Sequence, residues 1–480
     1  MSFSRILRSS ALMGGAQAVT LVMAFLRSKL IAVILGPTGI GLMGVFSAFN
    51  GNVSTVAGWG LGTSAVRIIA GADVDRRAQK TAAVRVLGIR LAWGGLMAVL
   101  LLVIPIGQLT FESQRYSVEL LIAGLAVPCI VATGMWSSLL QSGGHVGSLA
   151  RTQAISSFLG LLAGLPFIIL FGTVGIAVSI LIASAVTAAV TWRAASRFCP
   201  DAGVVPTHTD IRELLQLGLI FQVSGVLGAI AAYLVRVLIL RSHGEDLAAG
   251  LADVGYYQAA SAVTGSLPGV IFSATSSDFY PRVAAAKDES EARIITENQV
   301  KASLLLALPI LMALLTMGHL AVRLFYAEGF EPAVPLLDWF VWAIFLNLLG
   351  WPLGFWVSAR RSKRMVAAFQ GLLSVIVMLL TLLLVPFWGV KGAAIANLSF
   401  SLAYVLILVC LARRTSGSWI SLQTTSWMFA GAASLFAARA FVDLAGYGYW
   451  GLLPTALAAG ICAFVFFKAI DNSKASETSS

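Results

Sequence analysis

The most informative stretch of the chain is residues 17–67, which read QAVTLVMAFLRSKLIAVILGPTGIGLMGVFSAFNGNVSTVAGWGLGTSAVR. The stretch begins as an apolar helix that carries Arg27 and Lys29 in its interior. It turns at the Gly-Pro-Thr-Gly sequence of residues 36–39, continues as a second apolar run and ends in the glycine-rich residues 58–67. No Asp or Glu occurs before Asp73, so neither cation has an acidic neighbour in the sequence.

A cation inside a membrane-length helix is costly, at about 2.5–3.5 kcal/mol near the bilayer centre. Lys29 lies about six residues, or roughly 9 Å, before the turn, so its side chain can reach the headgroups by snorkelling. Arg27 lies deeper. For Arg27 the sequence leaves two interpretations open, a snorkelling side chain and a side chain that faces a water-filled cavity.

The whole chain has the composition of a membrane protein. Of its 480 residues 58% are hydrophobic and 11% are charged, with a mean hydropathy of +0.89, whereas a soluble protein carries about 25% charged residues. Apolar runs of about 20 residues recur along the chain. The sequence therefore predicts an all-α polytopic membrane protein.

The pattern predicts about fourteen spans. They lie near residues 10–35, 41–70, 84–107, 117–141, 152–171, 173–193, 213–240, 255–280, 299–325, 333–358, 365–386, 389–412, 425–443 and 448–468.

Basic residues gather in alternate loops, which explains the net charge of +11 without a nucleic-acid partner. The positive-inside rule then puts both termini in the cytoplasm of a multi-pass membrane protein. The four Cys and four His residues are scattered without metal-ligand spacing, so we expect no metal and no cofactor. Arg439 and Asp443 lie one helical turn apart and are expected to pair with each other.

Two pairs of segments resemble each other at one shared offset in residue number, which favours an internal repeat over a chance likeness of glycine-rich turns. Gln153 corresponds to Gln370, and Gly175 corresponds by the same shift to Gly392 (370 − 153 and 392 − 175), within the similar turns at residues 172–177 and 389–394. Residues 39–41 resemble residues 253–255 at a nearby offset. Two six-span halves in the same orientation imply a pseudo-two-fold axis along the membrane normal. The predicted domains are residues 1–205, residues 206–415, and a tail of two spans and a polar segment at residues 416–480.

Transporters built from such repeats bind their substrate between the halves, near the middle of the membrane. Arg27, Lys29 and Arg236 are the candidate residues for binding an anionic group, since arginine donates two hydrogen bonds at once to a phosphate. Snorkelling is an open alternative for Arg236. Arg67 and Arg90, toward the cytoplasmic side, are candidate contacts for the arriving substrate or headgroup anchors.

Several polar side chains interrupt the apolar runs and are candidate glycan contacts: Gln17, Asn50, Gln153, Gln222 and Tyr233. The alternative for each is a hydrogen bond between helices, worth about 0.6 kcal/mol on average. Asp278 is a candidate coupling acid, although the nearby Arg282 favours a structural ion pair.

Four segments carry a family resemblance: residues 27–29, 35–42, 58–67 and 278–282 (Asp-Phe-Tyr-Pro-Arg). They resemble Wzx-type O-antigen translocases, in the polysaccharide-transporter branch of the multidrug/oligosaccharidyl-lipid/polysaccharide flippase superfamily. The resemblance covers about the first 415 residues and is most specific in the first 70. It implies two pseudo-symmetric six-helix lobes around a cationic central cavity. The two C-terminal spans depart from the twelve that many members have.

The resemblance implies a flippase of the bacterial inner membrane that moves an undecaprenyl-diphosphate-linked oligosaccharide, such as an O-antigen unit, from the cytoplasmic to the periplasmic leaflet. Its other expected partners are membrane lipids, the polysaccharide polymerase and the chain-length machinery. The alternatives are a cation-coupled multidrug exporter of the same superfamily and a membrane glycan polymerase or ligase. An exporter needs a buried coupling acid, and the first two spans have none. A polymerase needs a catalytic loop, whereas the far-side acids are scattered over short turns, so we expect no enzyme activity.

Overall fold

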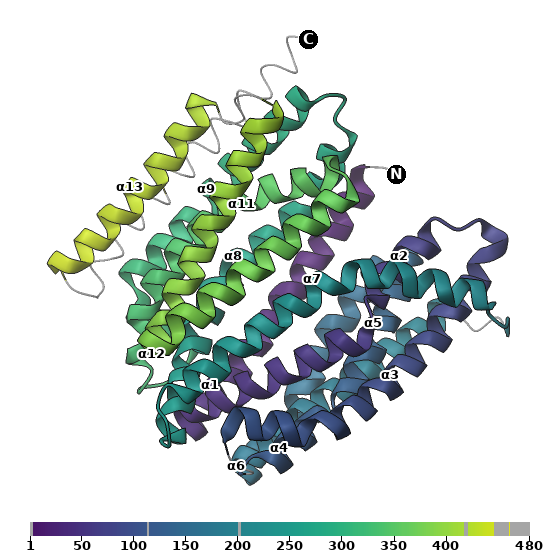
Figure 1. Cartoon of the computed structure of the whole chain (residues 1–480), viewed down its shortest axis with the longest axis horizontal. Helices are drawn as coiled ribbons and strands as arrows, with labels where there is room; N and C mark the ends of the chain where they lie inside the picture. The colour runs from purple at the N-terminus through teal and green to yellow at the C-terminus, as the bar shows by residue number, and fades with distance from the viewer. Residues whose placement is uncertain (1–2, 113–114, 200–202, 417–420, 446–459, 461–480) are drawn as a thin grey trace. The chain divides into compact units, whose positions relative to one another are not determined.

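The computed structural model describes residues 3–112, 115–199, 203–416, 421–445 and 460 (Figure 1). The described ranges contain helices and no strand: α1 (Phe3–Gly58), α2 (Leu61–Ala70), α3 (Val74–Phe111), α4 (Ser117–Gly124), α5 (Val127–Ser142), α6 (Val146–Phe198), α7 (His208–Arg241), α8 (Leu247–Ala285), α9 (Glu289–Thr316), α10 (Gly318–Phe325), the short 3-10 helix η1 (Glu331–Ala333), α11 (Val334–Arg360), α12 (Lys363–Ser416) and α13 (Leu422–Ala445).

Eight of the described helical segments are long and apolar enough to cross a membrane. Every predicted span up to residue 443 falls on described helices, and the span near residues 448–468 lies outside the described residues. The all-α polytopic fold is therefore confirmed, and the chain is a multi-pass membrane protein.

Three of the helices contain two membrane-crossing arms each. α1, α6 and α12 are interrupted at Gly36, Gly172 and Gly389, where φ is 64°, 56° and 53°. A straight helix of the 53 residues of α6 would extend about 80 Å, far more than the roughly 30 Å of a hydrocarbon core. Positive φ suits glycine, which lacks a Cβ, so a glycine marks each bend.

The two arms of α6 pack against each other through small residues. A Cβ added at Gly160 would lie 3.3 Å from Ala183, and one added at Gly164 would lie 3.1 Å from Ser179. Residue numbers rise on one arm as they fall on the other, so the arms run antiparallel. Small residues allow this close approach, which is a common way for helices to associate in membranes.

The backbone repeats the geometry at the offset found in the sequence. Gly172 and Gly389 are related by that offset and have φ/ψ of 56°/−120° and 53°/−133°. A Cβ at Gly175 would overlap the carbonyl of Phe167, and one at Gly392 would overlap that of Leu384. Gly392 and Leu384 lie at the same offset from Gly175 and Phe167 (392 − 175 and 384 − 167). This equivalence of the two contacts supports an internal repeat.

The bend glycines are expected to be intolerant of any side chain. We expect Gly172→Ala and Gly389→Ala each to destabilise the folded protein by about 1–3 kcal/mol, the usual cost of a residue forced into such a backbone conformation. Thermal unfolding of the purified variants measures this. Gly134→Ala is the matched control, because a Cβ there meets nothing within 4 Å. Bend variants that unfold at the temperature of the control would contradict the expectation.

The chain divides into two compact units. The first comprises Met1–Gln258 and Phe369–Ala393, and the second comprises Ala259–Ala368 and Ala394–Ser480. The predicted boundaries at residues 205 and 415 follow the sequence repeat rather than compactness, and they stay predictions.

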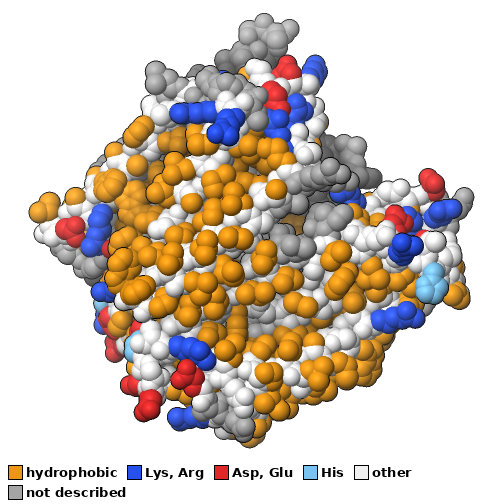
Figure 2. All heavy atoms as spheres, viewed as in Figure 1, with side chains coloured by type: hydrophobic (Ala, Val, Ile, Leu, Met, Phe, Trp, Pro, Cys, Tyr) orange, Lys and Arg blue, Asp and Glu red, His pale blue; other side chains and the backbone are white. Residues whose placement is uncertain are grey.

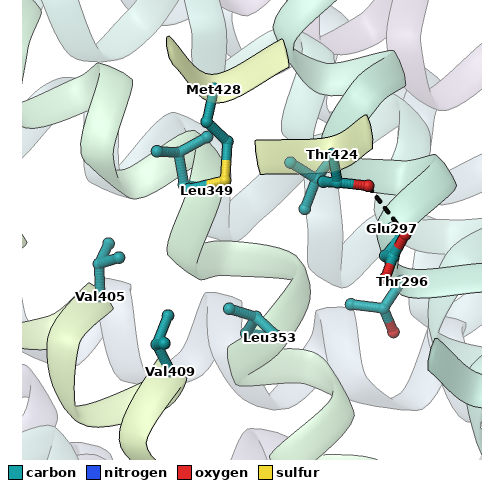
Figure 3. Close-up of a pocket in the computed structure, with 9 residues that line it drawn as sticks. Thr296, Glu297, Leu349, Leu353, Val405, Val409, Thr424 and Met428 are labelled. Carbon is teal, nitrogen blue, oxygen red and sulfur yellow. Dashed lines mark hydrogen bonds between the residues drawn. The ribbon is translucent and has the colours of Figure 1, made fainter. Parts of the chain in front are cut away.

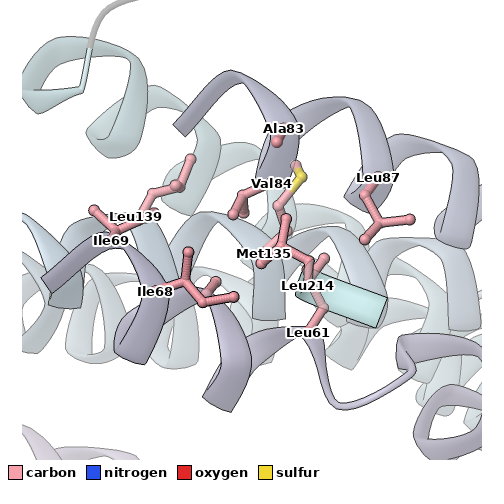
Figure 4. Close-up of a cluster of buried hydrophobic side chains, with 10 residues drawn as sticks. Leu61, Ile68, Ile69, Ala83, Val84, Leu87, Met135, Leu139 and Leu214 are labelled. Atoms are coloured by element: carbon pink, nitrogen blue, oxygen red, sulfur yellow. The ribbon is translucent and has the colours of Figure 1, made fainter. Parts of the chain in front are cut away.

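In the first unit α1 packs on α6 and α7, and α5 packs on α3 and α6. Around α2 lies a cluster of buried apolar side chains (Figure 4). It comprises Leu61, Ala65, Ile68 and Ile69 of α2, Ala83, Val84 and Leu87 of α3, Met135 and Leu139 of α5, and Leu214 of α7. α2 presents these side chains on one face, and their burial joins it to three neighbouring helices.

In the second unit α9 packs against α11 and α13. Arg439 of α13 forms the expected ion pair with Asp443, at 3.1 Å, and also one with Asp338 of α11, at 3.0 Å. The pair with Asp338 links α13 to α11, in addition to the packing of α13 on α9. Figure 2 shows apolar side chains over most of the visible face, with charged side chains gathered toward its margins, as expected for a protein that crosses a bilayer.

The membrane topology is tested with reporter fusions. Both termini are expected in the cytoplasm, so a fusion at Ser480 should report a cytoplasmic position and a fusion at Gly446 a periplasmic one. Both residues lie outside the described ranges. A periplasmic signal at Ser480 or a cytoplasmic one at Gly446 would contradict fourteen spans.

Candidate functional site: a cationic cavity

Arg27, on the first arm of α1, lines a cavity of about 440 Å³ inside the first compact unit. The second arm of α1 contributes Ser47, Asn50, Gly51 and Ser54, α5 contributes Ile130 and Thr133, and α6 contributes Ile180, Ala183, Ser184 and Thr187. Most of these side chains are polar but uncharged. Because α1 bends at Gly36, its two arms line the same cavity, with Arg27 on the first and Ser47, Asn50 and Ser54 on the second.

Arg27 is the one charged residue among the described residues that line this cavity. Within the described chain its half-buried side chain has neither an ion pair nor a hydrogen bond. A charge that has lost part of its hydration needs a counter-charge or water to offset the cost. The cavity therefore suits an anionic group that the guanidinium can bind with two parallel hydrogen bonds.

Asn50 supplies a second unsatisfied group. Its side chain is 2% exposed, and its Nδ2 donates to the carbonyl oxygen of Ala123 over 2.9 Å. Its Oδ1 has no hydrogen-bond partner among the described residues. A buried acceptor without a partner is costly, and a bound hydroxyl or water would satisfy it.

Three hydroxyl groups of the cavity donate to a carbonyl in the preceding turn of their own helix. Ser54 donates to Gly51 over 3.2 Å, Thr133 to Cys129 over 2.8 Å and Thr187 to Ala183 over 2.7 Å. Each oxygen keeps lone pairs that can accept from a ligand. The cavity thus combines one strong donor for an anion with several acceptors for the hydroxyl groups of a sugar.

A match to a known family covers more than half of the chain. Residues 6–287 match the family described as polysaccharide biosynthesis protein. The chain belongs to this family. The match contains every residue that lines the Arg27 cavity. The broader part of the predicted resemblance is confirmed, whereas assignment to the Wzx-type translocases stays a prediction. A comparison with curated proteins finds no match.

Comparison with solved structures shows that the chain has the fold of transporters of the MOP superfamily. A structure of the lipid II flippase MurJ in an inward closed conformation is 14% identical, with a TM-score of 0.73 over 96% of this chain and 99% of that one. An inward-facing multidrug resistance MATE family transporter is 17% identical, with a TM-score of 0.62 over 85% and 99%. A MOP superfamily transporter from Pyrococcus furiosus is 19% identical, with a TM-score of 0.56 over 85% and 95%.

Arg236 is held by its own surroundings rather than by the Arg27 cavity. Its Nη1 donates to the carbonyl of Ala232 over 2.6 Å and its Nη2 to Oε1 of Gln258 over 2.7 Å, and its guanidinium lies 5.7 Å from the ring centre of Tyr257. Its buried Nε has no partner within the described chain. The structure does not bring Arg236 into the cavity of Arg27, and its role in phosphate binding stays a prediction.

The other predicted cations also lie outside the cavity lining. Lys29 is half-buried on the same arm as Arg27, while Arg67 in the last turn of α2 and Arg90 on α3 are exposed. Their predicted roles are not tested by these positions.

Of the predicted glycan contacts, only Asn50 lines the cavity. Gln222 donates to the carbonyls of Thr55, over 2.5 Å, and Val56, over 3.2 Å, and so joins α7 to α1. The hydroxyl of Tyr233 lies 2.5 Å from that of Thr110 and joins α7 to α3. These two side chains make the hydrogen bonds between helices that the sequence left open as their alternative.

Three predicted residues are not placed in the cavity lining. Gln17 is exposed and Gln153 is half-buried. The side chain of Asp278 lies outside the described residues, so its predicted coupling role is untested.

The sequence interpretation missed the hydroxyl residues of the cavity. Ser47, Asn50 and Ser54 are spaced three and four residues apart and therefore share one face of a helix. This spacing was a usable signal. Serine and threonine also occur in apolar helices with their hydroxyls hydrogen-bonded to the preceding turn. The sequence therefore does not show which hydroxyls face a ligand cavity.

A pocket in the second unit is mostly apolar, and the carboxylate in its lining, Glu297, already accepts hydrogen bonds from the protein (Figure 3). It is lined by Val300, Leu349, Leu353, Val405, Val409 and Met428, with Thr296, Glu297 and Thr424 at one end. Glu297 accepts hydrogen bonds from the hydroxyls of Ser421 and Thr424 over 2.5 and 2.8 Å. In the described part of the chain no group of three His, Cys, Asp or Glu is arranged to hold a metal ion.

Proposed function

We propose that the protein is a flippase for a lipid-linked oligosaccharide. It would carry an undecaprenyl-diphosphate-linked O-antigen or related surface polysaccharide unit from the cytoplasmic to the periplasmic leaflet of the inner membrane by alternating access. The observation that carries the proposal is Arg27, a cation without a described partner in a cavity lined by hydroxyls and an amide. The diphosphate would bind the guanidinium, and the first sugars would bind the hydroxyl-lined wall.

The family and the fold support this proposal. The family is described as polysaccharide biosynthesis protein, and one protein with this fold is the lipid II flippase MurJ. A flippase makes and breaks no covalent bond. It lowers the barrier to moving a polar head group through hydrocarbon, where each unpaired polar group costs several kcal/mol. The polysaccharide polymerase and the chain-length machinery would receive the carried unit on the far side.

Deletion in the native host tests the function. We expect a lipid-linked oligosaccharide to accumulate in the cytoplasmic leaflet, where sugar analysis would identify it. Complementation with the native chain should restore its export. Unchanged export in the deletion strain, together with lost extrusion of cationic drugs, would reject the flippase and favour the multidrug exporter.

The energy source is expected to be the membrane potential. A diphosphate moves negative charge outward, and each net charge that crosses the field gains about 2.3 kcal/mol per 100 mV. Among its described residues the cavity lining has no acid to couple transport to H⁺ or Na⁺. Flipping in vesicles should follow an imposed potential and persist without ion gradients. Transport that ignores the potential and requires a proton gradient would contradict this expectation and make Asp278 the first residue to replace.

A further inference from the structure

A second cavity, of about 610 Å³, lies where α6 begins and ends. The antiparallel arms of α6 bring residues near its start beside residues near its end, and the cavity opens between them. Arg151 comes from the first arm, and Arg193 and Arg197 come from the second. We call this feature the basic groove. It shares no lining residue with the Arg27 cavity.

The basic groove has a strong positive charge. Arg193 and Arg197 are one helical turn apart, and Arg151 faces the same cavity. All three are exposed, and within the described chain none of them has an ion pair or a hydrogen bond. No carboxylate is found among the described residues that line the groove. Like charges at this spacing repel, so an anion between them would relieve the repulsion as well as gain its own attraction.

An apolar stripe continues from the groove along the first arm. Ile155 lines the groove, and Leu159 and Leu162 follow it at helical spacing on the same face. These side chains are 50%, 41% and 52% exposed, as on a surface that meets hydrocarbon. A soluble anion would leave the stripe uncovered. An amphiphile would satisfy both the arginines and the stripe.

We propose that the basic groove binds an anionic phospholipid of the surrounding membrane. Its phosphate would bind Arg151, Arg193 and Arg197, and an acyl chain would lie along Ile155, Leu159 and Leu162. The groove lies at the helix ends that the positive-inside rule assigns to the cytoplasmic side, where an anionic leaflet attracts basic side chains. The site does not depend on the identity of the transported substrate.

Native mass spectrometry of the full chain, titrated with phosphatidylglycerol or phosphatidylcholine, tests the proposal. The test variant is Arg151→Gln/Arg193→Gln/Arg197→Gln. The control Arg212→Gln/Arg413→Gln/Arg414→Gln loses the same charge from exposed positions elsewhere. We expect about a hundredfold weaker phosphatidylglycerol binding in the test variant only, which corresponds to about 1 kcal/mol per arginine. Phosphatidylcholine binding should be weak and equal in all three proteins.

A second variant keeps the charge and removes the stripe. Leu159→Gln/Leu162→Gln should weaken phosphatidylglycerol binding several-fold. This variant and the arginine test variant should both keep the thermal unfolding midpoint of the native protein. Equal phosphatidylglycerol binding by the native protein and the arginine variant would overturn the proposal. So would displacement of the lipid by inorganic phosphate, which would indicate a simple ion site. If polyprenyl diphosphate displaced the phosphatidylglycerol at a lower concentration than that of the phospholipid itself, the groove would be assigned to the transported lipid instead.

Discussion

Arg27→Ala is expected to abolish export of the lipid-linked oligosaccharide while the protein level stays normal. The guanidinium lines the cavity without a described partner, so its loss leaves no other described cation there to bind a diphosphate. Two charge-assisted hydrogen bonds contribute at least about 3 kcal/mol together, or roughly a hundredfold in binding. Export measured in the deletion strain carrying the variant checks this result.

Substitution by lysine distinguishes charge from geometry. Arg27→Lys keeps the charge but cannot make the bidentate contact, so we expect only partial export. Arg212→Ala is the matched control, since it removes an exposed arginine outside the cavity and should export normally. Normal export by Arg27→Ala would instead indicate that this side chain snorkels to the headgroups and takes no part in binding.

Gly41→Ala and Gly255→Ala are each expected to disrupt folding strongly. A Cβ at Gly41 would overlap the carbonyl of Leu251, and a Cβ at Gly255 would overlap the carbonyl of Pro37. The obstacle in each case is backbone, which cannot rotate away as a side chain can. Overpacking typically costs about 1–3 kcal/mol, and we expect each variant at or above the upper end of that range.

The two contacts are related by the repeat. Gly255 follows Gly41, and Leu251 follows Pro37, by the same number of residues (255 − 41 and 251 − 37). The Gly41–Leu251 and Gly255–Pro37 contacts are therefore equivalent with the roles of the two segments exchanged, as a pseudo-two-fold axis requires. Gly41→Ala and Gly255→Ala should therefore lower the thermal unfolding midpoint by similar amounts. Gly62→Ala, where a Cβ meets nothing within 4 Å, is the control. A Gly41→Ala protein that unfolds with the control would show that this crossing adjusts without cost.

Most of the fold could be predicted from the sequence because its determinants are local. Hydropathy identifies a helix that must satisfy its backbone hydrogen bonds inside hydrocarbon. Glycines in the turns between predicted spans, such as Gly172 and Gly389, lie where the backbone adopts a positive φ. The constant offset between the two halves was also visible in the sequence, and the structure repeats the same backbone geometry at that offset.

The candidate site could be predicted only in part. Arg27 and Asn50 were visible as polar groups in apolar runs, and both line the cavity. Gln222 and Tyr233 gave the same signal, yet they bond neighbouring helices. The sequence does not separate the two outcomes, since a polar side chain in a span satisfies itself equally with a ligand or with another helix.

Length, hydropathy and charge act along one segment at a time, so the sequence predicted a polytopic helical membrane protein with a cation deep in its first span. Which polar groups line the same cavity depends on tertiary packing. Thr133, Ser184 and Thr187 reach the Arg27 cavity because α5 and α6 pack on α1 there. Arg151 meets Arg193 and Arg197 because α6 folds back on itself at Gly172. Such proximity depends on contacts between residues far apart in the chain, so no local sequence pattern predicts it.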